Sequence, residues 1–405
     1  MKNLLIVLFP LLLLIANEDK VHQFSPISLP TGSVIDLNSS PCDKACVETY
    51  IRDKKPFSFM ANYNNHTEFR SLFLKYQSSL NLERNQALGK STKIALLVPS
   101  KTIGRYAMSI SKTVMAYLLT TKLPFELELY DSKDESEAHF LDELNKIEEA
   151  GFHYVIAPVT KDGANTLARI NHSLEIYIPT VNQKDMSVKN YLHYYGGIDY
   201  AAQIEYLKPL IQKELYIFDE QGNVSQSISK ASIQGVDNRP ISKFTINKRV
   251  IKYKKLFESI SFENNSTAIL NTQPVKTSLL LSQFVYQDIN LSAILATQLS
   301  YNPAILNLTQ ENDIKNFYIA NSIINIDSVI QEMNLLLGSD ISYNWINYAT
   351  TYFAHHIFAK NHNVTYQENS MFALPLINHQ IDYPIEVLKA KRKHFIKSDI
   401  LRDYL

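Results

Sequence analysis

From the stretch KIALLVP (93–99) onward, the chain alternates between short apolar runs and longer helical patterns, and this alternation strongly constrains its fold. The first run is followed by a helical pattern over 106–119, and HYVIAPV (153–159) is followed by another over 161–173. Apolar strands that each lead into a helix indicate a parallel sheet covered on both faces, with right-handed crossovers. The pattern resumes after Glu214, so the sequence predicts two successive α/β lobes with a cleft between them.

The size and charge of the chain are those of a protein with a large core and no strong electrostatic preference. Its 405 residues, 45% of them hydrophobic, are enough for more than one domain. Lys plus Arg equals Asp plus Glu at 40 each, so net charge gives no reason to expect a nucleic-acid partner. We interpret the basic stretch KAKRKHFIK (389–397) as a solvated terminal helix rather than a nucleic-acid site.

The N-terminus predicts export. One lysine precedes an apolar run from Leu4 to Ala16, which is too short to span a bilayer comfortably and is typical of a secretory signal peptide. Cleavage is expected near Ala16 or Asn17, and no cysteine follows that could carry a lipid anchor. An uncleaved signal anchor is the alternative. We therefore expect removal of residues 1–17, no transmembrane segment in the mature chain and a periplasmic location.

The two cysteines predict a disulfide in a small helical module. Cys42 and Cys46 lie in SPCDKACVETYI (40–51), and a spacing of four places them on one helical face. Their Cα atoms would then be about 6 Å apart, within the range that a disulfide tolerates. In an oxidising compartment a structural disulfide is favoured over two free thiols or a metal pair, since no further ligand follows at metal-binding spacing. The Ser-Pro pair before Cys42 can start a helix, so residues 18–90 are predicted to form a lead-in and this module.

Polar residues at the predicted strand ends are the candidates for binding a ligand. In open parallel sheets, ligands lie beyond the carboxyl ends of the strands. The candidates at these ends are Ser100, Thr102, Thr160, Asn182, Gln183, Asp219, Thr297 and Tyr301. The alternative is that Ser100 or Thr102, and Thr160, only cap the helices that follow, where a hydroxyl satisfies a free backbone N–H group.

No enzyme signature accompanies these candidates. PSKTIG (99–104) has one glycine and lacks the spacing of a phosphate-binding loop, and the chain has neither a Gly-x-Ser-x-Gly elbow nor a His-Glu-x-x-His pair. His355 and His356 lie in a helical pattern, and the acidic stretch DSKDESE (131–137) is interpreted as the start of a helix rather than a calcium loop. We therefore predict no catalytic residue, no metal and no cofactor.

Three asparagines are candidates for glycosylation. Asn38, Asn265 and Asn290 each begin an Asn-x-Ser/Thr triplet and have an acidic residue two positions before. This extended pattern resembles the acceptor of bacterial N-oligosaccharyltransferases. Chance explains the pattern about as well as modification does, so both interpretations stay open.

The arrangement as a whole resembles the type I periplasmic binding proteins, the family of the leucine/isoleucine/valine receptors. The likeness runs from about residue 93 to residue 361. KIALLVPSKTIGRYAMSISKTVMAYL (93–118) is similar to the opening strand and helix of that family, and GFHYVIAPVTKDGANTLA (151–168) to a strand that ends at the ligand cleft. EIYIPTVNQ (175–183) is similar to the next strand. YATTYFAHHIF (348–358) resembles the late helix that packs on the second lobe.

Within this superfamily, residues 292–323 most resemble the activators of penicillin-binding proteins, in the LpoA C-terminal domain. The resemblance implies an α/β, two-lobed type I periplasmic-binding-protein-like fold with parallel sheets, after a small helical N-terminal module. The bilobed domain would span 91–361, with lobes at about 91–212 and 213–345. A C-terminal segment, 362–405, could complete the lobes.

These features predict an exported, non-enzymatic cell-envelope protein that acts through protein partners, in the regulation of cell-wall synthesis or as a scaffold. The alternative is a periplasmic receptor for an amino acid or another small molecule, which closes by hinge motion between the lobes. A deep pocket with convergent polar groups would favour the receptor, and a cleft filled by side chains would favour the scaffold.

Overall fold

The computed structural model describes residues 42–63, 66–79, 91–104, 106–234, 236, 239–246, 253–362, 364 and 370–400. The chain divides into two compact units, residues 1–85 and 86–405. The predicted signal peptide and Asn38 lie outside the described residues. Among the helices that the structure describes, none combines the length and the apolar character that a membrane span requires.

The first unit is a small helical module held around aromatic side chains. Its helices are α2 (Lys44–Arg52), α3 (Pro56–Ala61), the short 3-10 helix η1 (Thr67–Phe69) and α4 (Arg70–Ser79). Asp43 caps α2 by accepting a hydrogen bond from the Cys46 N–H group at 2.9 Å. Val47 and Phe59 are fully buried in its core. The predicted disulfide between Cys42 and Cys46 is present, with Cα atoms 5.5 Å apart.

The second unit contains two seven-stranded sheets, each the centre of one lobe. The strand order of the first sheet is β11 (Leu376–Ile377), β12 (Gln380–Ile381), β5 (His193–Tyr195), β4 (Glu175–Ile178), β3 (Tyr154–Ile156), β1 (Thr92–Val98) and β2 (Phe125–Asp131). All neighbours are parallel except β11 and β12. β1 is buried on both faces, as a continuous apolar run in a parallel sheet predicts.

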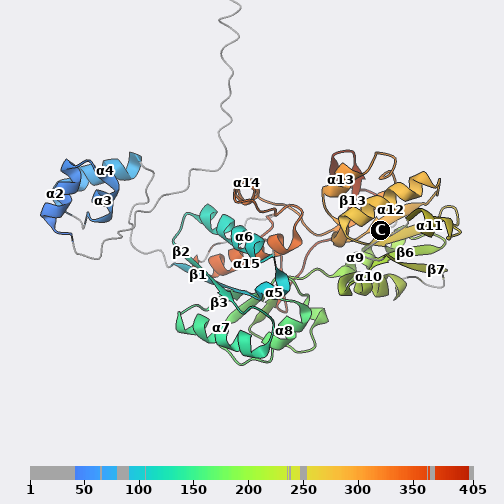
Figure 1. Ribbon diagram of the computed structural model, residues 1–405, viewed down its shortest axis with the longest axis horizontal. Coiled ribbons are helices and arrows are strands. Elements are labelled where there is room, and N and C mark those ends of the chain that lie inside the picture. The colour runs from blue at the N-terminus through green and yellow to red at the C-terminus, as the bar shows by residue number, and fades with distance from the viewer. Residues whose placement is uncertain are drawn as a thin grey trace, which may run out of the picture. The chain divides into compact units, whose positions relative to one another are not determined.

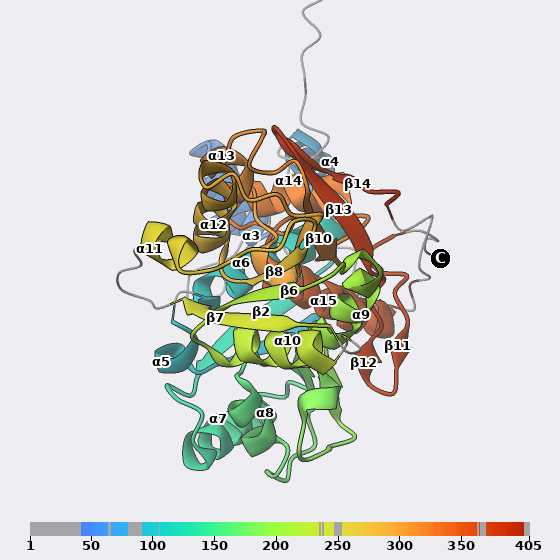
Figure 2. The same ribbon diagram turned by 90° about the vertical axis from the view of Figure 1, so that its right-hand side faces the viewer.

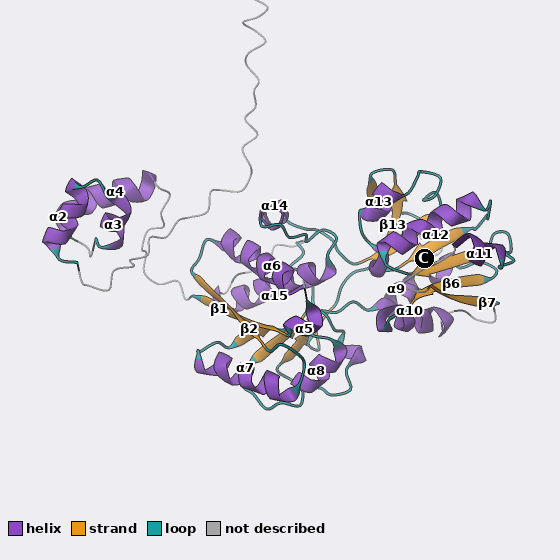
Figure 3. Ribbon diagram, in the orientation of Figure 1, coloured by secondary structure: helices purple, strands orange, loops and turns teal. Residues whose placement is uncertain are grey.

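Helices cover both faces of the first sheet (Figures 1 and 3). One face packs against α6 (Tyr106–Thr121) and α15 (Trp345–His362), and the other against α7 (Glu137–Glu149) and α8 (Lys161–Leu167). α14 (Ser328–Leu336) packs on α6, and the short α5 (Ser100–Ile103) precedes α6. These elements form the first lobe.

The second sheet is built in the same way. Its order is β14 (His394–Lys397), β13 (Glu386–Lys391), β10 (Phe317–Asn321), β9 (Ala293–Ala296), β8 (Thr267–Asn271), β6 (Leu215–Glu220) and β7 (Ile241–Ile246). One face packs on α9 (Tyr200–Leu207) and α10 (Asn223–Gln234), and the other on α11 (Tyr253–Glu258), α12 (Pro274–Tyr286) and α13 (Ala304–Leu308) (Figure 2). β13 and β14 are antiparallel to their neighbours, and the other strands are parallel. The predicted α/β class with mostly parallel sheets is confirmed.

The two lobes are interleaved in sequence and are not consecutive halves of the chain. The predicted lobe limits were about 91–212 and 213–345. However, α9 already packs on the second sheet, and α14 and α15 return to the first lobe. The expectation that 348–358 packs on the second lobe is therefore wrong. An amphipathic pattern shows that a helix covers a sheet, but it does not show which sheet.

The C-terminal segment adds strands to both lobes. β11 and β12 extend the first sheet, and β13 and β14 extend the second. The basic stretch 389–397 is a β-hairpin with a turn at Arg392 and Lys393, so the prediction of a terminal helix is wrong. The buried residues Val387, Leu388 and Ala390 pack on the second sheet, which stabilises strand pairing over a solvated helix.

Within the described part of the chain, three crossovers connect the lobes. The first crossover (196–199) joins β5 to α9, the second (322–327) joins β10 to α14, and the third (382–385) joins β12 to β13. Because the chain passes between the lobes at these three places, we refer to the crossovers as the hinge region of the second unit.

Candidate functional site

The eight residues predicted to bind a ligand lie at strand ends, but in two lobes and in different surroundings. Asn182 and Gln183 line a pocket at the crossovers. The other six do not line that pocket: in the first lobe they are Ser100, Thr102 and Thr160, and in the second Asp219, Thr297 and Tyr301.

Ser100 is held by a carboxylate of its own chain. At the start of α5, its N–H group and its hydroxyl donate to Asp131 at 3.2 and 2.8 Å. Burial opposes ionisation of Asp131, but the hydrogen bonds from Ser100 and from the Lys133 N–H group outweigh burial and hold the pKa of this carboxyl below its ordinary value. Thr102, on the same short helix, is exposed.

Thr160 caps α8 and also contacts a carboxylate. Its hydroxyl accepts from the Gly163 N–H group at 3.2 Å and donates to Glu135, which also accepts from the Thr160 N–H group at 2.6 Å. The Glu135 carboxylate lies directly over Gly163, where a β-carbon would collide with it. Helix N-termini attract anions. Here the anion is a side chain of the protein itself.

Asp131 and Glu135 both come from DSKDESE (131–137), which was interpreted as the start of the next helix. α7 does begin at its last residue, Glu137. The two earlier carboxylates instead reach α5 and α8, which come from other βα units of the sheet. The acidic stretch was the available signal for these contacts, but only the order of the strands brings its two ends beside those helices.

Asp219 and Glu220 show the same pattern in the second lobe. The buried Asp219 accepts from the Asn271 side-chain amide at 2.9 Å and forms an ion pair with Lys243 at 2.9 Å. Glu220 pairs with Lys276 and accepts from the Gln273 N–H group at 3.0 Å, at the start of α12. The carboxylates at the end of β6 are thus neutralised by neighbouring residues of the same lobe.

Thr297 and Tyr301 differ from the other candidates. Thr297 is fully buried, and its hydroxyl has no hydrogen-bond partner among the described residues. The Tyr301 ring packs on Tyr343 of the first lobe and on Phe395 of β14, with ring centroids 5.1 Å apart in both cases. Burial raises the pKa of Tyr301 well above its ordinary value, so its hydroxyl stays protonated. Tyr301 therefore joins the two lobes through an aromatic cluster.

Two adjoining pockets lie at the crossovers. The larger has a volume of about 540 Å³ and the smaller about 390 Å³, and they share four lining residues: Lys184, Asp199, Ala202 and Ile385. Tyr206 and Pro209 line only the larger pocket, and Ser322 and Tyr383 only the smaller one. This is a concave surface on the hinge side, formed by both lobes.

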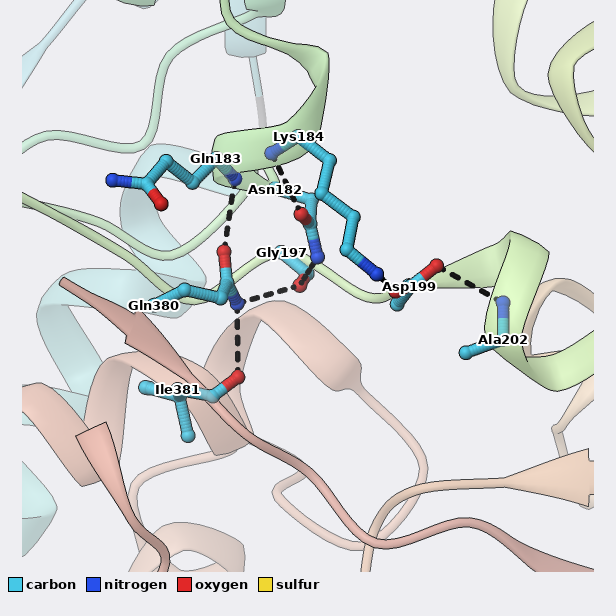
Figure 4. Close-up of polar contacts among 8 residues, drawn as sticks. All are labelled: Asn182, Gln183, Lys184, Gly197, Asp199, Ala202, Gln380 and Ile381. Carbon is cyan, nitrogen blue, oxygen red and sulfur yellow. Dashed lines mark hydrogen bonds and ion pairs between the residues drawn. The ribbon is translucent and has the colours of Figure 1, made fainter. Parts of the chain in front are cut away.

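Asn182, Gln183 and Gln380 line the smaller pocket and form a hydrogen-bond network (Figure 4). The Asn182 amide donates to the Gly197 carbonyl at 3.0 Å. The Gln380 amide donates to the same carbonyl at 3.2 Å and accepts from the Gln183 N–H group at 2.9 Å. A side chain at Gly197 would collide with the backbone of residues 181 and 182. These amides therefore join the first crossover to β12, which leads into the third.

An ion pair and a helix cap continue this network toward the second lobe. Lys184 pairs with Asp199, and Asp199 caps α9 by accepting from the Ala202 N–H group at 3.0 Å (Figure 4). The Tyr383 hydroxyl, on the third crossover, donates to the Gly196 carbonyl at 3.0 Å.

A second buried network of amides supports the second crossover. The Gln203 side chain accepts from the Gln298 N–H group at 2.9 Å and donates to the Ser322 hydroxyl at 3.1 Å. The Gln298 side chain accepts from the Ser322 N–H group at 2.7 Å. Sequence reasoning missed Gln203, Gln298, Ser322 and Gln380, because amides and hydroxyls separated by tens of residues carry no spacing signal.

A pair of histidines, of which His193 is buried and His172 half-buried, lies beside the first crossover. The Nε2 atoms of His193 on β5 and of His172 are 3.0 Å apart, so one ring donates to the other. The His379 ring contacts the His193 carbonyl at 3.1 Å. Burial lowers the pKa of His193 to about 3 and, to a lesser degree, lowers that of His172, so the pair is neutral near pH 7. Among the described residues, no three or more His, Cys, Asp or Glu side chains form a group that could hold a metal ion.

Two of the three candidate glycosylation sites lie side by side in the second lobe. Asn265 is exposed, and its N–H group donates to the Asn290 carbonyl at 3.0 Å. Its φ angle of 62° places it in a tight turn, and Thr267, the hydroxyl residue of its Asn-x-Ser/Thr triplet, is fully buried. An enzyme that reads the Thr267 hydroxyl would need to act before this turn folds. Modification of these residues stays a prediction.

Comparison with known proteins supports the fold. No protein-family model and no curated protein matches the chain. Among solved structures, the leucine-binding protein LivK of Thermotoga maritima is 13% identical, with a TM-score of 0.54 over 76% of this chain and 97% of that chain. LivJ of Streptococcus pneumoniae, solved with isoleucine, is 10% identical, with a TM-score of 0.54 over 76% of this chain and 100% of that one.

Full-length LpoA of Haemophilus influenzae is also similar. It is 12% identical, with a TM-score of 0.52 over 87% of this chain and 68% of that chain. The second unit therefore has the two-lobed type I periplasmic-binding-protein fold that the sequence predicted. At these identities the likeness shows the fold alone.

Proposed function

We propose that this chain is an exported, non-enzymatic protein of the cell envelope that acts through protein partners, in the regulation of cell-wall synthesis or as a scaffold. The observation that carries the proposal is that carboxylates of the chain occupy the positions at the strand ends where an anionic ligand would bind. Glu135 occupies the N-terminus of α8, Asp131 that of α5 and Glu220 that of α12.

These carboxylates oppose binding of a free amino acid or another anion. A ligand carboxylate at the start of α8 would have to displace Glu135 from two hydrogen bonds and would meet its charge. In the second lobe, Lys243 and Lys276 are already paired with Asp219 and Glu220. The aromatic contact of Tyr301 with Tyr343 further holds the lobes together without a ligand.

The second candidate function is a periplasmic receptor for an amino acid or another small molecule. Two observations favour it. The neighbours LivK and LivJ are described as binding proteins for branched-chain amino acids or leucine. In addition, the buried Thr297 hydroxyl and the Asn271 side-chain oxygen have no hydrogen-bond partner among the described residues, and a ligand could supply one.

A thermal-shift experiment separates the two functions. The purified mature protein is heated alone and with each of the twenty amino acids at millimolar concentration. A ligand present at 100 times its dissociation constant would stabilise the native state by about 2.7 kcal/mol, which is a clear shift in melting temperature. We expect no shift. A saturable shift that Thr297→Val abolishes would refute the proposal and establish the receptor.

Protein partnership and export are tested separately. A photo-reactive amino acid placed at half-buried Tyr206, in the larger pocket, should cross-link an envelope protein in living cells, whereas the same group at exposed Tyr191, which lines neither pocket, serves as the control. Cross-links that do not depend on position would argue against a specific partner at this surface. N-terminal sequencing of the exported chain tests cleavage near Ala16, and an intact mass with no added glycan would end the prediction for Asn38, Asn265 and Asn290.

A further inference from the structure

The β13–β14 hairpin concentrates positive charge in a chain that is otherwise balanced. Residues 386–397, EVLKAKRKHFIK, contain five Lys or Arg and a single acid, whereas the whole chain has 40 of each sign. Lys397 pairs with Glu386 at 2.6 Å, and Lys389 lies over the Tyr318 ring at 5.5 Å from its centroid. The other three cations are at the tip, at Lys391, Arg392 and Lys393.

The three cations at the tip are exposed, and none of them forms an ion pair with another described residue. The three residues lie at a tight turn, since Lys391 is the strand partner of His394 across it. Like charges held close together repel one another, and an anionic partner would relieve that repulsion.

Among the strands that the structure describes, β14 is an open edge of the second sheet (Figure 2). In an antiparallel pair, only every second residue bonds to the neighbouring strand. The Ser398 N–H group donates to the Val387 carbonyl at 2.8 Å, so residues 394, 396 and 398 face β13. The backbone groups of Phe395 and Lys397 therefore face away from β13, toward the open side.

We propose that the edge of β14 accepts an extended, acidic segment of a partner protein as an added strand. The inference rests on the proposed function, because it names the chemistry of one partner. The outward N–H and C=O groups of β14 would supply main-chain hydrogen bonds, and Lys391, Arg392 and Lys393 would pair with the acidic side chains. Lysines on an edge strand usually prevent strand addition. Lysines disfavour an added strand that is apolar or basic, but they attract an acidic strand, so this edge would select an acidic segment.

Two other anionic partners fit the hairpin less well. Membrane insertion needs an exposed apolar side chain, and Phe395 and Ile396 are half-buried in the protein. A nucleic acid is bound through many phosphate contacts, and three cations at one turn provide few. The acidic peptide uses both the charge and the open backbone.

The test measures binding of a fluorescein-labelled Glu-Val repeat peptide to the mature, disulfide-intact protein by fluorescence anisotropy. A Lys-Val repeat of equal length is the control peptide. We expect the Glu-Val peptide to bind and the Lys-Val peptide not to bind. The affinity for the Glu-Val peptide should fall as the salt concentration is raised. The charge variant K391Q/R392Q/K393Q should lose about tenfold in affinity, the product of three exposed charge pairs.

A second pair of variants tests the backbone contribution. Lys397→Pro removes an outward N–H group but no bond to β13, and Lys397→Gln removes the same ion pair while it keeps that N–H group. Peptide affinity should fall in Lys397→Pro and stay within twofold of wild type in Lys397→Gln. Equal thermal unfolding of the variants shows that each has folded.

Four results would overturn the inference: equal binding to wild type and the charge variant, equal binding to the two Lys397 variants, hairpin-dependent binding to phosphatidylglycerol vesicles without peptide binding, or hairpin-dependent self-association of the protein alone. If the peptide does not bind but an envelope protein is still cross-linked at Tyr206, the β14 edge is rejected as a binding surface and the proposed function is retained. A saturable shift with an amino acid would reject the proposed function and leave the peptide result untouched.

Discussion

The contact between Glu135 and Gly163 gives a quantitative test of whether a carboxylate of the chain occupies the N-terminus of α8. The perturbation is Gly163→Ala, made both in the wild type and in a Glu135→Ala background. Gly163 is helical, so alanine by itself should stabilise the protein by about 0.5–1 kcal/mol. In the wild type, however, the new β-carbon would collide with the Glu135 carboxylate.

The Glu135 carboxylate must move to relieve the collision, and we expect it to leave Thr160. That movement breaks two hydrogen bonds to a charged group, worth about 1.5–3 kcal/mol each when buried. Because Thr160 is exposed and water can replace its bonds, we take about 1.5 kcal/mol for the pair together. Gly163→Ala should thus destabilise the wild type by about 0.5–1 kcal/mol and stabilise the Glu135→Ala protein by the same amount.

The assay is urea unfolding followed by the fluorescence of the single tryptophan, Trp345, which lies on α15 in the first lobe. The four proteins form a double-mutant cycle with an expected coupling of about 1.5 kcal/mol. If Gly163→Ala has the same effect in both backgrounds, within about 0.5 kcal/mol, Glu135 does not occupy the helix end. The main support for a cleft without a ligand would then be lost.

Three further predictions concern other parts of the chain. Burial lowers the pKa of His193 to about 3, so the stability that its neutral form contributes is complete above the ordinary pKa of 6.5 and is lost as pH falls toward 3. Between these two pH values, the urea midpoint of His193→Gln should therefore vary less with pH than that of the wild type. Parallel curves of midpoint against pH for the two proteins would contradict this. Cys42→Ser should destabilise the first unit by about 2 kcal/mol, the effect of opening so short a loop, and proteolysis should then cut within 44–79 while the second unit stays intact. Gly197→Ala should cost more than about 2 kcal/mol because its β-carbon meets backbone, whereas Gly151→Asn, with no atom within 4 Å of the new β-carbon, should cost no more than about 1 kcal/mol.

The fold class could be predicted because each strand of the parallel sheets carries its own signal. The continuous apolar runs at 94–98 and 268–270 become buried strands, and a helical pattern follows each. The assignment of α15 to a lobe could not be predicted, because its apolar surface would suit either sheet. The basic hairpin was mistaken for a helix because its cations dominate a pattern in which Val387, Leu388 and Ala390 are the buried positions.

The candidate site could be predicted only in part. The order of the strands places Ser100, Thr160 and Asp219 at strand ends, as expected. Their partners could not be found from the sequence, because Glu135 and Asn271 reach them across neighbouring βα units. The hinge networks were missed for the same reason: Gln183 and Gln380 are bonded to each other but lie far apart along the chain.

The interleaving of the lobes also determines the order in which they can be completed. Tyr195 on β5 must wait for its strand partner Gln380, and the first sheet lacks the cover of α15 until residue 362 has been made. The parallel strands of the second sheet, in contrast, are all available once Asn321 has been made. During synthesis the second lobe can therefore gather most of its core while the first lobe still exposes an apolar face on Ile94, Leu96 and Val98. Long-range closure of this kind is slow, so a chain truncated before α15 should aggregate through the first lobe and not through the second.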